Sequence, residues 1–170
     1  MNEVELKFLD IDVNEIKSKL EKLGAVLIYD TYIESYSFYS NDFHGSDSSK
    51  KYLRVRKIDN EIIVTYKDPA KDSDMTLRQE VEISVNDYEN TLLLFEKLGF
   101  KKGGVFRKHR VHYEFNNIHF ELDTLENIPT YLEIETTSED DMRFMCVKLD
   151  LDITKGRKGT IIEIFPNKFN

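Results

Sequence analysis

The chain has 170 residues, of which 40% are hydrophobic and 33% charged, so it can bury a sizeable core and is not expected to be disordered. Its formal net charge of −8 argues against a broad nucleic-acid or anionic-membrane surface, because those partners favour net positive charge. The single cysteine, Cys146, excludes an internal disulfide and suits a reducing compartment. No signal peptide or apolar run of membrane-spanning length is found, so a cytoplasmic location is expected.

Strand-like and helix-like patterns alternate along the chain. In chain order they predict a strand over 2–9, a helix over 13–24, strands over 31–40, 51–58, 61–68 and 76–85, a helix over 87–99, strands over 105–115, 117–124 and 130–137, a helix over 139–149 and a strand over 160–165. The segments 41–50 and 68–75 are polar and predict loops, and 59–61 and 116–117 predict hairpin turns.

A weak internal repeat relates the two halves of the chain. EVEL at 3–6 leads through a helix to EKLGA at 21–25, and EVEI at 80–83 leads through a helix to EKLGF at 96–100. No linker separates the halves. We therefore expect one domain over 1–170.

The predicted strands carry apolar residues on one face and almost purely ionic residues on the other, because alternate side chains of a strand point to opposite faces. A solvated sheet face is the ordinary explanation for any single strand. The signs separate by strand, however, which a solvated face does not require. The cations are Arg54, Arg56, Lys67, Lys108 and Arg110, and the anions are Glu3, Glu5, Asp123, Glu133 and Glu135.

If the sheet closes into a barrel, these charged faces line its interior, and about eight strands would leave a narrow lumen. Several Arg and Lys side chains converging from different strands suit a polyanion such as a polyphosphate. Carboxylates would repel that ligand unless a divalent cation such as Mg²⁺ or Mn²⁺ lay between them. The pattern therefore favours a polyphosphate bound with one or two metal ions.

The motifs that carry these charges resemble those of the CYTH superfamily, the triphosphate tunnel metalloenzymes. Glu3-Val-Glu-Leu-Lys7 is similar to the ExExK signature of that family. The later motifs follow in the same order up to about residue 136: LRVR with Arg54 and Arg56, TYK with Lys67, RxExE with Arg78, Glu80 and Glu82, KxRxxY with Lys108, Arg110 and Tyr113, LD with Asp123, and LEIE with Glu133 and Glu135.

The resemblance implies an α+β fold, an eight-stranded antiparallel tunnel with helices packed outside. It also implies triphosphate binding by Lys7, Arg54, Arg56, Lys67, Arg78, Lys108 and Arg110. It implies ligation of Mg²⁺ or Mn²⁺ by Glu3, Glu5, Asp123, Glu133 and Glu135. Of these residues we expect Lys7, Arg56 and Asp123 to act in catalysis, and we expect Glu80 and Glu82 to pair with cations inside the barrel.

Two segments depart from the family pattern. The glycine-rich turn before LEIE is replaced by Glu126–Thr130, and the C-terminal strand over 160–165 lacks its usual tyrosine. The histidines His44, His109, His112 and His119 form no spaced metal motif. His112 and His119 are expected to reach the barrel interior, in a supporting or structural role rather than a catalytic one. We expect Cys146 to lie in the core, and the basic loop 155–158 to be solvated or to close over a phosphate.

Class IV adenylate cyclases are the members that the chain resembles most, so conversion of ATP to cyclic AMP and pyrophosphate is the first expectation. A triphosphatase acting on tripolyphosphate, thiamine triphosphate or a nucleotide is the alternative, and a non-catalytic nucleotide or polyphosphate sensor is the third. No nucleic-acid or membrane partner is expected. A homodimer is compatible with the sequence.

Overall fold

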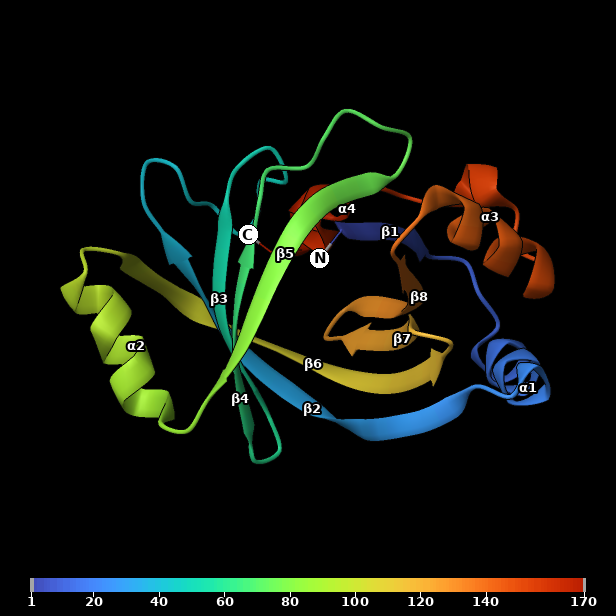
Figure 1. Ribbon diagram of the computed structural model, residues 1–170, viewed down its shortest axis with the longest axis horizontal. Helices are drawn as coiled ribbons and strands as arrows, with labels where there is room; N and C mark the ends of the chain where they lie inside the picture. The colour runs from blue at the N-terminus through green and yellow to red at the C-terminus, as the bar shows by residue number, and fades with distance from the viewer. Residues whose placement is uncertain (1, 170) are drawn as a thin grey trace.

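The computed structural model describes residues 2–169 and forms a closed barrel of eight strands (Figure 1). All neighbouring strands are antiparallel, in the order β1-β5-β4-β3-β2-β6-β7-β8. The strands are β1 Asn2–Phe8, β2 Val26–Tyr39, β3 Tyr52–Ile58, β4 Glu61–Lys67, β5 Thr76–Val85, β6 Lys101–Phe115, β7 Ile118–Leu125 and β8 Ile128–Thr136. The helices are α1 Val13–Leu23, α2 Tyr88–Lys97, α3 Glu139–Lys148 and α4 Ile161–Ile164, with 3₁₀ turns η1 Ile153–Lys155 and η2 Pro166–Lys168.

Strand β1 closes the barrel because it pairs with β5 on one side and β8 on the other. Its register places Glu5 opposite Glu135 and Lys7 opposite Glu133. The charged faces of the strands therefore turn inward, as the alternation predicts. The eight-stranded barrel with external helices confirms the expected fold class.

Helices α1, α2 and α3 cover the apolar outer face of the barrel. In Figure 1, α1 and α3 lie together at one side and α2 lies at the other. Val4 and Leu6 of β1 pack in a buried cluster with Leu20 of α1 and Cys146 of α3. Cys146 thus lies in the core, where burial raises the pKa of its thiol to about 11.

The predicted helices 13–24, 87–99 and 139–149 match α1, α2 and α3 to within two residues at each end. Asp12, Asp87 and Ser138 cap their N-termini by accepting backbone N–H groups, which an Asp or Ser before a helix commonly does. Gly24 follows α1 with φ +87°, a left-handed conformation that glycine adopts without steric cost.

The predicted strand over 160–165 is wrong, because this segment forms α4. Thr160 and Glu163 make a reciprocal capping box: the Thr160 hydroxyl accepts the Glu163 N–H and the Glu163 carboxylate accepts the Thr160 N–H. Both edges of β1 are already paired, so closure of the barrel needs no C-terminal strand. The short apolar run IIEI fits either a strand or a buried helical turn, and the capping pair selects the helix.

The predicted strands over 31–40 and 105–115 begin too late, since β2 starts at Val26 and β6 at Lys101. These two strands pair along most of their length, with register shifts between Leu27 and Tyr29 and between Tyr36 and Phe38. The hairpin turns were predicted correctly: Asp59, Asn116 and Asn117 all have positive φ. No helix within residues 2–169 has the length and apolar character needed to cross a membrane.

Candidate active site

The interior of the barrel holds a cavity of about 210 Å³. All seven cations that the sequence assigns to phosphate binding line it: Lys7, Arg54, Arg56, Lys67, Arg78, Lys108 and Arg110. They come from five of the eight strands, and a narrow closed barrel is what brings them together. The predicted ligands Glu5, Glu133 and Glu135 line the same cavity, whereas Glu3 lines an adjoining opening and Asp123 is completely buried.

Several of the cations are already matched by carboxylates. Lys67 Nζ lies 2.7 Å from both Glu3 and Glu80, and Arg78 Nε donates to Glu3 at 3.2 Å. Arg56 pairs with Glu82 at 3.1 Å. Glu80 and Glu82 therefore pair with cations inside the barrel, as predicted.

Arg54 and Arg56 both have unused hydrogen-bonding capacity. The Nε–H of each is buried and has no hydrogen-bond partner within residues 2–169. The hydrogen bond of Arg54 to Thr65 is long, at 3.4 Å. Burial lowers the pKa of Arg56, and the neighbouring charge of Arg54 lowers it further. Two adjacent guanidinium groups with unpaired buried donors fit an anion with several oxygens.

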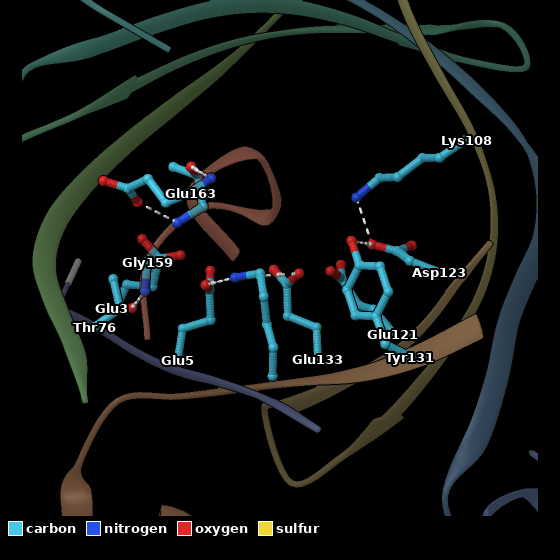
Figure 2. Close-up of polar contacts among 12 residues, drawn as sticks. Glu3, Glu5, Thr76, Lys108, Glu121, Asp123, Tyr131, Glu133, Gly159 and Glu163 are labelled. Atoms are coloured by element: carbon cyan, nitrogen blue, oxygen red, sulfur yellow. Dashed lines mark hydrogen bonds and ion pairs between the residues drawn. The ribbon is translucent and has the colours of Figure 1, made fainter. Parts of the chain in front are cut away.

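The carboxylates of the interior form two groups in which one ligand atom from each residue lies within 4.8 Å of the others: Glu3, Glu80 and Glu135, and Glu121, Asp123 and Glu133. Figure 2 shows Glu3, Glu5, Glu133 and Glu121 in a row along one wall. Glu121 was missing from the predicted ligands, although its alternation with Asp123 in HFELD places both on one face. The ligand role of each predicted acid stays a prediction.

The buried carboxylates suit a hard divalent cation, because their negative charges repel one another where they face each other. Burial and the nearby Glu133 charge raise the pKa of Glu5 to about 7, even though Lys7 contacts its carboxylate. Burial and the Glu3 charge raise the pKa of Glu135 well above its usual range. Mg²⁺ or Mn²⁺, which prefer carboxylate oxygens, would neutralise this repulsion.

Replacing Glu5 by glutamine is expected to stabilise the metal-free protein. A carboxyl whose pKa is higher in the folded state than in the unfolded state loses stability as pH rises, here between about 4.5 and 7. The shift corresponds to about 3 kcal/mol at pH 8, which Glu5→Gln would recover in the free energy of unfolding measured with urea.

Glu133→Gln is the matched control, and it is expected to change the free energy of unfolding in the opposite direction. Burial opposes the charge of Glu133, but Lys7, Lys108 and Arg110 outweigh it and lower the pKa of Glu133 to about 2. Its charge therefore stabilises the fold above about pH 4.5, and that contribution is lost as pH falls toward 2. Glu133→Gln should destabilise at pH 8. A Glu5→Gln protein that is less stable than wild type at that pH would contradict the assignment.

Asp123 is surrounded by donors. Arg110 Nε donates to Oδ1 at 2.7 Å and Arg110 Nη2 to Oδ2 at 2.6 Å, Lys108 Nζ donates to Oδ2 at 2.6 Å, and the Tyr131 hydroxyl donates to Oδ2 at 3.3 Å. Figure 2 shows Lys108 of β6 reaching Asp123 of the neighbouring strand β7. Asp123 therefore holds in place two cations that line the cavity.

One part of the cavity wall is apolar, where Ile33 and Phe106 are joined by Ile161 and Ile162 of α4. The segment before α4 is fixed to β1 by two backbone hydrogen bonds between Lys7 and Arg157, of 2.9 and 2.8 Å. Glu163 also accepts hydrogen bonds from the N–H and hydroxyl of Ser48, both at 3.0 Å. The segment expected as a closing strand thus lines the cavity as a helix.

The cavity is also lined by Tyr29, His112 and His119, which the sequence did not assign to the site. Tyr29 was missed because the strand was predicted to begin at residue 31. The apolar run Val26–Ile28 could have extended it. The expected structural role of His112 and His119 is consistent with their mutual hydrogen bond of 3.1 Å.

Comparison with known proteins places the chain in a family. The CYTH domain matches residues 1–152. A Methanocaldococcus jannaschii protein with a provisional adenylate cyclase name is 34% identical over 142 residues, which cover 82% of this chain and 79% of that protein. The solved PH1012 protein of Pyrococcus horikoshii is 32% identical, with a TM-score of 0.78 and coverage of 95% of this chain and 98% of that one.

A more distant solved structure shares the fold. It is a provisionally named adenylyl cyclase of Hippeastrum, described as having a dominant triphosphatase activity. It is 15% identical, with a TM-score of 0.61 and coverage of 98% of this chain and 95% of that one. The family match spans most of the chain and includes every charged motif described above, and the protein therefore belongs to the CYTH domain family.

Proposed function

We propose that this protein is a metal-dependent enzyme that binds a triphosphate inside the barrel, and that it converts ATP to cyclic AMP and pyrophosphate. The observation that supports this most directly is the pair Arg54 and Arg56. Their buried Nε–H groups have no partner among the described residues and lie in the same barrel as two groups of carboxylates. Membership of the CYTH family and the name of the M. jannaschii relative agree with it.

The residues of the chain would bind and orient the substrate. Arg54 and Arg56 offer planar forks to phosphate oxygens, and Lys108 and Arg110 are held in place by Asp123. The carboxylate groups would hold Mg²⁺ or Mn²⁺, which would neutralise phosphate charge and lower the pKa of the attacking hydroxyl. Catalysis would then depend on positioning and on electrostatic stabilisation of the departing pyrophosphate.

The apolar part of the wall favours a nucleotide over an inorganic triphosphate. Ile33, Phe106, Ile161 and Ile162 offer no donors to phosphate, but they suit the planar, weakly polar base of a nucleotide. The alternative is a triphosphatase, in which water replaces the ribose hydroxyl as nucleophile. It would use the same cations and carboxylates, and the Hippeastrum protein with this fold is described as having a dominant triphosphatase activity.

Incubation of the pure protein with ATP and with tripolyphosphate, each with Mg²⁺ or Mn²⁺, separates the two reactions. Cyclic AMP and pyrophosphate in equal amounts are expected from ATP. Release of orthophosphate without cyclic AMP would contradict the cyclase proposal and support the triphosphatase alternative. Absence of turnover with both substrates and both metals would contradict an enzymatic role.

A further inference from the structure

Tyr29 lies inside the barrel at an irregular point of β2. It is opposite His112 of β6, and the register between these strands shifts between Leu27 and Tyr29. Such bulges re-aim side chains and are common beside active sites. The Tyr29 and His112 rings are 4.9 Å apart between centroids, and both line the cavity.

Tyr29, His112 and His119 form a chain of hydrogen bonds. The Tyr29 hydroxyl lies 3.2 Å from His112 Nδ1, and His112 Nε2 lies 3.1 Å from His119 Nδ1. A carboxylate oxygen of Glu121 lies 3.5 Å from His112 Nδ1. Because a carboxylate accepts but does not donate, it favours the tautomer of His112 with its hydrogen on Nδ1.

That tautomer determines which group donates in each hydrogen bond that links Tyr29, His112 and His119. We assign His112 Nδ1–H as a donor shared by the Tyr29 oxygen and the Glu121 carboxylate, and His119 Nδ1–H as the donor to His112 Nε2. The hydrogen of the Tyr29 hydroxyl then takes no part in the hydrogen bonds with His112 and His119. It can donate to a group in the cavity.

Charges of both signs surround Tyr29: the Glu121 carboxylate and the guanidinium groups of Arg110 and Arg56. Burial and the Glu121 charge raise the pKa of Tyr29, so its hydroxyl keeps its hydrogen. The charges of Arg110 and Arg56 act on Tyr29 in the opposite direction, which shows that both guanidinium groups lie near it. Arg56 has a buried Nε–H without a partner in the part of the chain that the structure describes.

We propose that Tyr29 is a substrate-binding residue, whose hydroxyl donates a hydrogen bond to a phosphate oxygen lying between Arg56 and Arg110. His112 and His119 are positioning residues, because they hold the Tyr29 oxygen as an acceptor and so direct its hydrogen into the cavity. This assignment rests on the proposed function. It adds an uncharged hydrogen-bond donor to the Lys and Arg side chains proposed to bind the triphosphate.

The test measures the dissociation constant of tripolyphosphate by calorimetry at one pH and one Mg²⁺ concentration. Tyr29→Phe keeps the ring and removes only the hydroxyl, and it should raise the dissociation constant roughly 10-fold, as for loss of one hydrogen bond to a charged group. Tyr32→Phe is the matched control. Tyr32 also lies on β2, with its ring 4.9 Å from that of His109, but it is 76% exposed. Its substitution should leave binding unchanged.

A double-mutant cycle tests the positioning role of His112. His112→Phe should weaken tripolyphosphate binding in the wild-type background and have little further effect in Tyr29→Phe, because both changes remove the same contact. Equal effects in the two backgrounds would show that His112 only packs against its neighbours and would overturn its positioning role.

The outcomes separate this proposal from the proposed function. If wild-type protein binds no tripolyphosphate, or binds it as tightly after Arg56→Ala, the triphosphate site itself is wrong. If Arg56→Ala abolishes binding while Tyr29→Phe matches wild type, only the assignment of Tyr29 fails. Thermal melts of each variant, compared with wild type, confirm that the folded protein is being measured.

Discussion

Arg56→Ala is expected to weaken triphosphate binding about 100-fold or more, and to abolish turnover at substrate concentrations that saturate wild type. A guanidinium in this position can make more than one charge-assisted hydrogen bond, each worth about 1.5–3 kcal/mol. Its Nε–H is buried and unpartnered within residues 2–169, so this donor costs the fold free energy unless a ligand accepts it. Calorimetry with tripolyphosphate and initial rates with ATP measure the two effects.

The fold should tolerate the loss of Arg56. Its partner Glu82 retains the hydrogen bond donated by the Thr65 hydroxyl at 2.6 Å, and removal of Arg56 relieves its repulsion with Arg54. The melting temperature should therefore not fall while binding is lost. Arg56→Lys should give an intermediate loss, because it keeps the charge but not the planar fork.

Arg107→Ala is the control for nonspecific loss of positive charge. Arg107 also lies on a barrel strand, but its side chain is 65% exposed and pairs with Glu34 at 2.6 Å. Binding and turnover should match wild type. Unchanged tripolyphosphate affinity in Arg56→Ala would show that the anion does not occupy this cavity.

Asp123→Asn is expected to destabilise the metal-free protein by about 3–5 kcal/mol, the usual effect of removing one partner from a buried ion pair. Asp123 has no exposed area, and its two oxygens balance the charges of Arg110 and Lys108. The free energy of unfolding in urea, with a chelator present, measures this effect. The chelator removes any contribution from metal binding.

Two further variants test whether unbalanced buried charge causes the loss of stability in Asp123→Asn. Asp30→Asn removes an aspartate whose side chain is 48% exposed and which contacts His109 at 2.8 Å, so it should change stability by no more than about 0.5 kcal/mol. Adding Lys108→Met to Asp123→Asn removes one of the unbalanced cations and should recover part of the loss. A loss below about 1 kcal/mol in the single variant would show that Asp123 does not balance Arg110 and Lys108.

Much of the barrel could be predicted because the alternation of charged and apolar residues along a strand matches the two sides of a barrel wall, the interior and the outer face. Glu3 and Glu5 alternate with Val4 and Leu6, and the structure turns the first pair inward and buries the second pair under helices. The same argument places Glu121 inside, although it was not chosen as a ligand.

Other features could not be predicted because they depend on contacts between distant segments. α4 replaces the expected strand because β1 already has two neighbours, and the sequence of residues 160–165 contains no record of that pairing. Tyr29 points inward beside a register shift that only the partner strand β6 defines. The direction of the hydrogen-bonded chain through His112 is likewise set by a carboxylate on a third strand, β7.

The double pairing of β1 has a consequence for folding. Its partners, β5 and β8, lie more than 70 and 120 residues away along the chain, so these ladders are among the most non-local contacts in the protein. Non-local pairings are expected late, because the entropy of closing long loops opposes them. The carboxylates of β1 and β8 therefore meet only when the barrel closes. A divalent cation bound between them would stabilise the closed barrel relative to any open intermediate, and would link assembly of the site to completion of the fold.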